Sequence, residues 1–460
     1  MFKKLIIINM LFIGGFIQAK TNDAFELIAE SNIQIISQKL DGYMQALTAL
    51  NRFSGAVIVA KGNTVLLNKG YGFASHEFEI LNTSQTRFRI CSITKMVTAL
   101  AILQLQERGL LKVSDKLDKY FPDFPRGNEI TIHHLLAHTS GISSSNVPYE
   151  MVVQPTSLEQ LIVFATNKPL EFDPGSDFRY SNAGYFILSA LIEKISGKTY
   201  ESFIKENILA PLNMNESFFR DQDYSILKNC AVGYCMNEAN KLVNGHYVYE
   251  NFKGSGGLFC NAHDLYTFLR VLNKGELINK ESRRMMFTSY HDAENYGYGC
   301  NVHDHYKHPW IEHGGMLSSG FKSNATIFIN DDIYIVVLSN FFSAWAHEAR
   351  EALVAIMFEL PYEFPRGDVI KIDSIIYDDY KGAYDHPAFK EGYSIQKKED
   401  KLYLPNNSEL LPVATDQFMI LDGKSSHLVY TFIRNEEGRV IQLRIKGGAP
   451  YFEVRCEKIG

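Results

Sequence analysis

One almost uninterrupted apolar run constrains this chain more than any other stretch. Between Ile90 and Leu105, Lys95 is the only residue with a formal charge, so the run predicts a helix buried on every side within a large domain. Ser92 precedes the apolar positions, and we expect it to cap the helix N-terminus because serine is favoured there. The helix should end at Arg108-Gly109, since glycine is typical of helix stops.

Ser92 and Lys95 are three residues apart, which puts both side chains on one face of the expected helix. A lysine surrounded by apolar side chains has a lowered pKa, so its neutral form can accept a proton from serine near pH 7. The pattern therefore predicts a serine nucleophile with a lysine base. Alternatively, serine only caps the helix and lysine extends to solvent, and the motif alone leaves this open.

Two later segments carry polar residues beside turns or glycines. Tyr180 and Asn182 follow a turn-rich stretch, and their spacing lets both point the same way in an extended chain. In the alternative, Tyr180 packs into the core and Asn182 caps the next helix, which should run to Gly197. His313 precedes Gly314-Gly315-Met316, where glycine lets a ligand lie against bare backbone.

His134 and His138 are four residues apart, a spacing that metal ligands use on helices. Leu135 follows His134, however, so the glutamate of a His-Glu-x-x-His zinc site is absent. We weigh a metal site here against two structural histidines, and we expect the protein to use no metal and no other cofactor.

The first residues indicate export. Lys3 and Lys4 precede an apolar stretch over 5–17, and Ala19 offers a small residue for cleavage, so residues 1–19 are expected to be a signal peptide. A retained N-terminal anchor is the alternative, and no other segment looks long and apolar enough to span a membrane. We expect a periplasmic or secreted protein.

Charge and cysteine content limit the partners. The net charge of −6, without a long basic block, argues against nucleic acid as a partner. Six cysteines in 460 residues do not form a disulfide scaffold. Cys230 and Cys235 are close enough in sequence to pair, and Cys91 is expected to be a small buried apolar residue. The oligomeric state cannot be derived from the sequence.

Strand patterns divide the chain. Residues 54–60 and 64–67 flank Lys61-Gly62-Asn63 as a hairpin would, and residues 325–329 and 333–338 are strand-like. Residues 361–367 have the composition of a linker. Short alternating runs over 401–404, 428–433, 440–445 and 451–455 then predict a separate antiparallel β domain. We expect a main domain over 20–362 and a second domain over 368–460.

Taken together and in this order, Ser92-x-x-Lys95, Tyr180-x-Asn182 and His313-x-Gly315 resemble the three signature elements of the serine β-lactamase and penicillin-binding protein superfamily. The tyrosine points to its class C β-lactamase branch. The resemblance extends over roughly residues 30–360. The C-terminal region resembles the lipocalin-like β domain often appended to these hydrolases.

The resemblance implies an α+β fold: an antiparallel sheet flanked by helices, with an all-helical subdomain beside it and a C-terminal antiparallel β-barrel-like domain. The active site would lie between sheet and subdomain, at the N-terminus of the Ser92 helix. Ser92 would be the nucleophile of an acyl-enzyme, with Lys95 and Tyr180 sharing proton transfer.

Other roles follow from the same resemblance. Asn182 would hold a substrate amide, and the strand with His313 and Gly315 would pair with the substrate as an added strand. The backbone N–H groups of Ser92 and Met316 would form the oxyanion hole.

The third element departs from active β-lactamases, which usually carry lysine where this chain has His313. Neutral imidazole binds a carboxylate less well than ammonium does, so we expect carboxylate binding to tighten as pH falls through about 6.5. The resemblance implies an exported serine hydrolase acting on D-amino-acid peptides, for example peptidoglycan-derived ones, or on β-lactams. A carboxylesterase-like activity and a slowly deacylating penicillin-binding sensor remain alternatives.

Overall fold

The computed structural model describes residues 32–459, apart from residues 144–156, 168, 221–225, 238–240, 246–251, 292, 305–307, 343–344, 366–371, 387–392, 421–427 and 448–451. The signal peptide expected over residues 1–19 lies outside this part of the chain.

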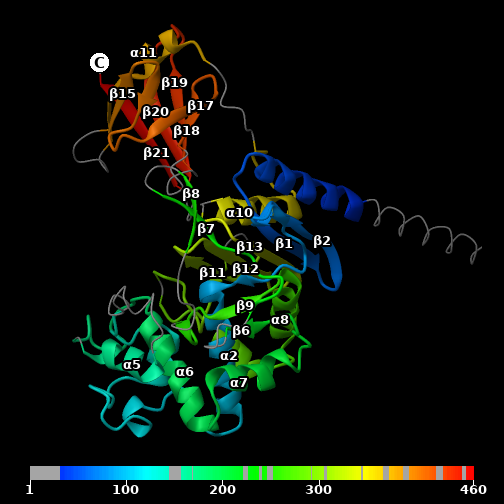
Figure 1. Cartoon of the computed structure of the whole chain (residues 1–460). Coiled ribbons are helices and arrows are strands. Elements are labelled where there is room, and N and C mark those ends of the chain that lie inside the picture. The colour runs from blue at the N-terminus through cyan, green and yellow to red at the C-terminus, as the bar shows by residue number, and fades with distance from the viewer. Residues whose placement is uncertain are drawn as a thin grey trace, which may run out of the picture.

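A six-stranded antiparallel sheet organises the main domain, in the order β10-β11-β12-β13-β1-β2 (Figure 1). Its strands are β1 (Gly55–Lys61), β2 (Thr64–Tyr71), β10 (Asn301–His303), β11 (Trp310–Leu317), β12 (Phe321–Phe328) and β13 (Ile333–Ser339). β1 and β2 form the expected hairpin, and β12 and β13 confirm the two later strands. β1 also pairs with β13, so strands far apart in sequence meet at the centre of the sheet.

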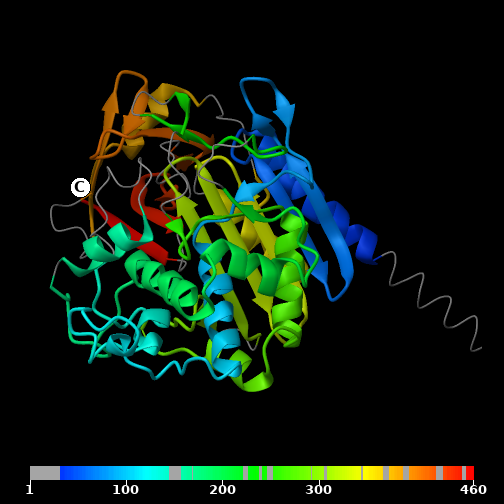
Figure 2. The ribbon, with the colours of Figure 1, turned by 60° about the horizontal axis from the view of Figure 1, so that its bottom comes forward.

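Helices cover both faces of this sheet (Figure 2). A helix over residues 32–49 and α10 (Trp345–Met357) pack with Val57 and Val337 on one face. α2 (Thr94–Glu107) and α8 (Ala262–Lys274) pack with Ile58 on the other. Neighbouring strand residues thus contribute to different cores, because successive side chains of a strand point to opposite faces.

α2 confirms the buried helix: Thr94 to Leu105 are all buried. The helix ends at Glu107, and its C-cap Arg108 precedes Gly109, which has φ of 71°. The cap was predicted wrongly. Ile93 occupies the N-cap position without a side-chain cap, and Ser92 lies in a 3₁₀ turn ahead of the helix. Ser92 cannot act as the cap there because its hydroxyl faces Lys95 Nζ instead.

A helical subdomain lies beside the sheet, as expected. It contains α3 (Ile132–Leu136), α5 (Leu158–Thr166), α6 (Asn182–Ser196) and α7 (Tyr200–Ile204), and α9 (Lys280–Met286) packs nearby against α2. Short elements connect these parts: β3 (Phe73–Ser75), β4 (Ile80–Leu81), β5 (Phe88–Arg89), β6 (Phe218–Phe219), β7 (Tyr234–Met236), β8 (Leu242–Asn244) and β9 (Leu258–Cys260). α6 ends before Gly197, as predicted.

The C-terminal region is a closed antiparallel barrel of eight strands, β14 to β21. Its strands are β14 (Gly382–Asp385), β15 (Tyr393–Lys398), β16 (Lys401–Tyr403), β17 (Glu409–Ala414), β18 (Gln417–Met419), β19 (Val429–Arg434), β20 (Val440–Gly447) and β21 (Phe452–Ile459), preceded by α11 (Tyr377–Tyr380). Side chains such as Tyr380 and Phe432, stacked at 4.5 Å, belong to its own core. Met419 instead joins the cluster under α10, so the barrel docks on the main domain.

All six cysteines are free thiols, including Cys230 and Cys235, and Cys91 is buried as expected. None of the helices in the described part of the chain combines the length and apolar composition needed to cross a membrane.

Candidate active site

Ser92 lies in the 3₁₀ turn Cys91–Ile93, between the sheet and α2. The hydroxyl of Ser323 on β12 donates a 2.7 Å hydrogen bond to the carbonyl oxygen of Ile90, which holds the start of the turn against the sheet. Cys91 has φ of 51°, a conformation uncommon for residues with a side chain. The turn presents Ser92 to a cavity beside β11.

Lys95 is completely buried and is the second residue of α2. Its Nζ lies 3.2 Å from Ser92 Oγ, 2.7 Å from Asn182 Oδ1 and 2.8 Å from the backbone oxygen of Ser255. All three partners are oxygens without formal charge, and the ring of Tyr180 lies 4.8 Å away. Burial therefore lowers the pKa of the Lys95 amine well below its usual value.

Tyr180 and Asn182 lie on either side of Ser181, the N-cap of α6, which begins at Asn182. Ser181 caps this helix by accepting the backbone N–H of Gly184, so the alternative in which Asn182 caps it is wrong. The amide oxygen of Asn182 instead accepts a hydrogen bond from Lys95 Nζ. Burial raises the pKa of the Tyr180 phenol, and a hydrogen bond with Ser92 only partly offsets this shift. Tyr180 is consequently a protonated phenol at neutral pH.

His138 holds the Tyr180 segment in place. Its Nδ1 accepts the backbone N–H of Ser181 at 3.1 Å, and its carbonyl oxygen accepts that of Arg179 at 2.9 Å. Its ring lies 4.4 Å from the ring of Tyr180. These contacts assign His138 a structural position, and α3 ends at Leu136, so the histidine pair considered for a metal does not share a helix face.

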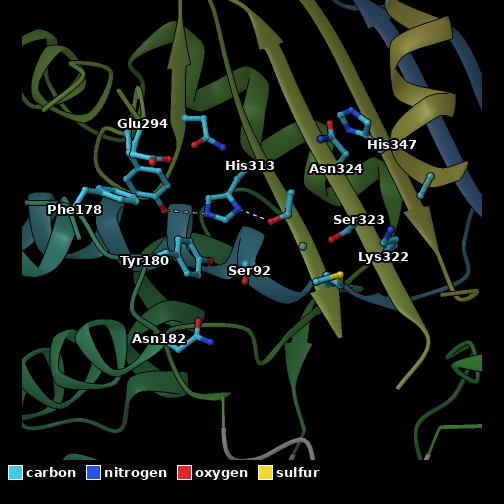
Figure 3. A pocket seen from close by; sticks show the side chains of 16 residues that line it. Ser92, Phe178, Tyr180, Asn182, Glu294, His313, Lys322, Ser323, Asn324 and His347 are labelled. Atoms are coloured by element: carbon cyan, nitrogen blue, oxygen red, sulfur yellow. Dashed lines mark hydrogen bonds between the residues drawn. The ribbon is translucent and has the colours of Figure 1, made fainter. Parts of the chain in front are cut away.

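His313 is only 3% exposed, and both of its ring nitrogens form hydrogen bonds with other protein groups. Nε2 lies 3.0 Å from the hydroxyl of Tyr296, and Nδ1 lies 2.5 Å from the carbonyl oxygen of Gly314, as the dashed lines in Figure 3 show. Burial, followed by the nearby Lys95, lowers the pKa of the imidazole to about 3. The expectation that His313 gains charge near pH 6.5 is wrong, because burial keeps the imidazole neutral.

Gly315 and Met316 follow His313 on β11, and they differ in their exposure to solvent. Gly315 is buried, and a Cβ added there would come within 2.3 Å of Ser323 Oγ. Met316 is 60% exposed and lines the cavity together with Ser92. The glycine therefore permits the close approach of strand and turn, whereas the residue after it faces the cavity.

The cavity has a volume of about 580 Å³. Six of the lining residues are predicted from the sequence: Ser92, Tyr180, Asn182, His313, Gly315 and Met316. Other lining residues are not: Phe178, Tyr296, Lys322, Asn324 and His347 (Figure 3). These residues belong to no motif, and only the fold brings them to Ser92. Within the described residues, no group of three His, Cys, Asp or Glu side chains is positioned to hold a metal ion.

Comparisons with known proteins cover this whole site. The Beta-lactamase family model matches residues 37–356, more than half of the chain. Penicillin-binding protein 4* of Bacillus subtilis (strain 168) is 27% identical over 418 residues, covering 83% of this chain and 91% of that protein. The Teichoic acid D-alanine hydrolase of Staphylococcus aureus (strain MRSA252) is 26% identical over 309 residues, covering 66% of this chain and 72% of that protein.

A solved structure extends the similarity into the C-terminal region. The octameric penicillin-binding protein homologue from Pyrococcus abyssi superposes with a TM-score of 0.66 at 25% sequence identity. The match covers 91% of this chain and 99% of that one.

Proposed function

The chain belongs to the beta-lactamase family, a family of serine hydrolases, and on that basis we propose that it is an exported enzyme that cleaves D-alanyl amide or ester bonds through an acyl-enzyme on Ser92. The observation that carries the proposal is the set of atoms around the Lys95 amine. A neutral amine has two N–H groups and one lone pair. The oxygens of Asn182 and Ser255 accept the two N–H groups, which leaves the lone pair for the hydroxyl of Ser92 at 3.2 Å.

Acylation then proceeds without an external base. The Ser92 hydroxyl proton passes to Lys95 Nζ as Oγ bonds to the substrate carbonyl carbon. The neutral Tyr180 phenol donates its proton to the leaving nitrogen or oxygen as that bond breaks, and Lys95 returns a proton to the phenol oxygen. Water deacylates the enzyme by the reverse route: it adds to the acyl carbon, and the proton it releases returns to Ser92. The raised pKa of Tyr180 suits a proton donor.

Backbone N–H groups stabilise the negative charge that develops on the substrate carbonyl oxygen. We assign this role to the N–H groups of Ser92 and Met316, because both residues line the cavity. Each such donor contributes roughly 3 kcal/mol in enzymes of this type. Asn182 holds Lys95, and we also assign it contact with the substrate amide.

The D-alanyl preference has two supports. One relative is named for hydrolysis of D-alanine from teichoic acid. The position where active β-lactamases usually carry lysine holds His313, whose pKa of about 3 leaves it neutral at physiological pH. We therefore propose that β-lactams acylate Ser92 and that the resulting acyl-enzyme hydrolyses slowly. The acyl-enzyme formed from D-alanyl substrates hydrolyses fast enough for turnover.

Intact mass spectrometry tests this proposal. Benzylpenicillin and a fluorophosphonate should each add one group to the full-length protein, and peptide mapping should locate it at Ser92. Ser92→Ala should abolish both adducts and the hydrolysis of a D-alanyl ester, while Ser37→Ala, on the surface of the helix over residues 32–49, should change neither. Adducts at another residue would reject the nucleophile, and fast β-lactam turnover without D-alanyl hydrolysis would reject the substrate class.

Export has its own test. N-terminal sequencing of protein recovered from the periplasm or medium should begin after Ala19. Protein confined to the cytoplasm with Met1 retained would reject export.

A further inference from the structure

Among the described residues that line the cavity, Lys322 is the only lysine or arginine. It lies on β12 directly opposite Met316 of β11 in the strand register. Paired residues of neighbouring strands point to the same side of a sheet, so Lys322 and Met316 share one face. In Figure 3, Lys322 and the acidic Glu294 lie on opposite sides of Ser92. The cavity therefore has one basic end and one acidic end.

The Lys322 ammonium has no carboxylate partner within ion-pair distance among the described residues. Its Nζ lies 5.4 Å from the ring of Phe342. Burial lowers the pKa of the Lys322 amine, and the charge of Glu348 on α10 opposes this shift. Burial raises the pKa of that carboxyl to about 7, however, and Arg52 is a stronger influence on it than Lys322 is. A half-buried ammonium in this position gains most from an anion that enters the cavity.

The side of β11 that Lys322 shares stays uncovered at residue 314 because that residue is glycine. A Cβ added to Gly314 would meet only the carbonyl oxygen of Ser323, at 3.9 Å, so its place is empty space in the cavity. Gly314 and Met316 lie on the same side of β11, as does Lys322 across the register. The neutral His313 on the other side of the strand offers no charge to a substrate.

We propose that Lys322 binds the free carboxylate of the substrate and thereby selects acyl donors that carry one near the scissile bond. The proposal rests on the proposed D-alanyl hydrolase function and names the residue that reads the charge of the substrate. In this proposal a residue of β12 binds the substrate carboxylate, in place of the third signature element on the neighbouring strand β11.

The test compares two substrates that differ only in charge. A peptide ending in D-alanyl-D-alanine and its C-terminal amide are assayed with the full-length enzyme. The wild type should prefer the carboxylate in kcat/KM. Lys322→Met should lower kcat/KM for the carboxylate by roughly ten- to hundredfold, as for loss of a hydrogen-bonded charge pair, and change that for the amide less than threefold. Lys322→Arg should retain the preference in part.

Lys280→Met is the matched control, since it removes an exposed lysine at the start of α9 and should leave the preference unchanged. Equal loss for both substrates in Lys322→Met would assign a structural role to Lys322 and overturn the proposal. So would a wild type that treats the two peptides alike, a measurement that needs no variant. If penicillin does not acylate Ser92 in the wild type, the proposed function itself fails. Acylation that proceeds without charge preference rejects only the role of Lys322.

Discussion

Gly315 lies so close to Ile90 that a Cβ added to the glycine would come within 2.4 Å of the Ile90 carbonyl oxygen. Ile90 immediately precedes the turn that carries Ser92, and Gly315 immediately precedes Met316 on β11. The turn that carries Ser92 and the strand that lines the cavity are therefore in direct contact. This contact determines how far the serine lies from the cavity-lining strand.

Gly315→Ala should separate these segments. The added methyl group would also lie 2.3 Å from Ser323 Oγ and 2.8 Å from Cys91 Cβ, and the backbone has to move to accommodate it. Overpacking of this kind costs roughly 1–3 kcal/mol of stability. Denaturant unfolding should show that loss, and the rate of Ser92 acylation should fall at least as strongly. Gly314→Ala is the control for stability, because its methyl group enters open space and should leave the unfolding midpoint unchanged.

Lys95→Arg should slow acylation by roughly a hundredfold or more, because arginine keeps its proton at every accessible pH and cannot act as a base. In the wild type, the acylation rate with a neutral ester should stay level above the lowered pKa of Lys95 and fall as pH drops below it, since the protonated amine has no lone pair. Stopped-flow acylation from pH 5 to 9 measures both effects. Lys280→Arg, on the surface, is the control, and near-normal acylation by Lys95→Arg would exclude the lysine as base.

KM for a carboxylate substrate should not respond to His313 between pH 5.5 and 8. The imidazole is neutral over this range because its pKa is about 3. In an unfolded chain the same imidazole titrates near 6.5. It therefore binds more protons unfolded than folded below that pH, and the stability it contributes is full above pH 6.5 and lost as pH falls toward 3. An inflection of KM near 6.5 that disappears in His313→Gln would contradict the neutral assignment.

His138 should act on catalysis through Tyr180. His138→Ala removes both the acceptor for the Ser181 N–H and the ring packed on Tyr180. It also places alanine at φ of 59°, where asparagine is tolerated better. His138→Asn offers an amide oxygen to the same N–H, so kcat should decrease in the order wild type, His138→Asn, His138→Ala, with KM for a small ester little changed. Equal kcat in the two variants would show that the Ser181 hydrogen bond does not position the tyrosine.

The barrel should stabilise the main domain without serving its chemistry. Every residue that lines the cavity precedes residue 348, whereas Met419 of β18 is buried in the cluster under α10. Met419→Ala should lower the free energy of unfolding by roughly 2–5 kcal/mol and leave acylation unchanged. A chain ending at Tyr362 should likewise retain acylation if it folds. A folded truncation that penicillin does not acylate would show that the barrel completes the site.

Local patterns in the sequence determined a large part of this protein. The lone charge of Lys95 in an apolar run implied a buried lysine, because such a run can only lie inside a core. Gly109 and Gly197 marked helix ends, since few other residues adopt positive φ at low cost. Four of the eight barrel strands were visible as alternating runs, whereas the short β18 and the Pro412-containing β17 were too irregular to identify.

The tertiary structure decided what these residues can do. From the sequence alone, the imidazole of His313 is expected to have an unshifted pKa. Its burial beside Tyr296 and Lys95 lowers that pKa and keeps the imidazole neutral. Lys322 and His138 belong to no recognisable catalytic pattern. The register of β11 with β12 brings Lys322 to the cavity, and His138 packs against the Tyr180 ring behind it. A side chain's protonation depends on its solvation and on charges a few ångströms away, and those neighbours come from distant parts of the chain. Sequence spacing therefore indicated Ser92 and Lys95 as the proposed nucleophile and base, while folding alone set the charges of the side chains around them.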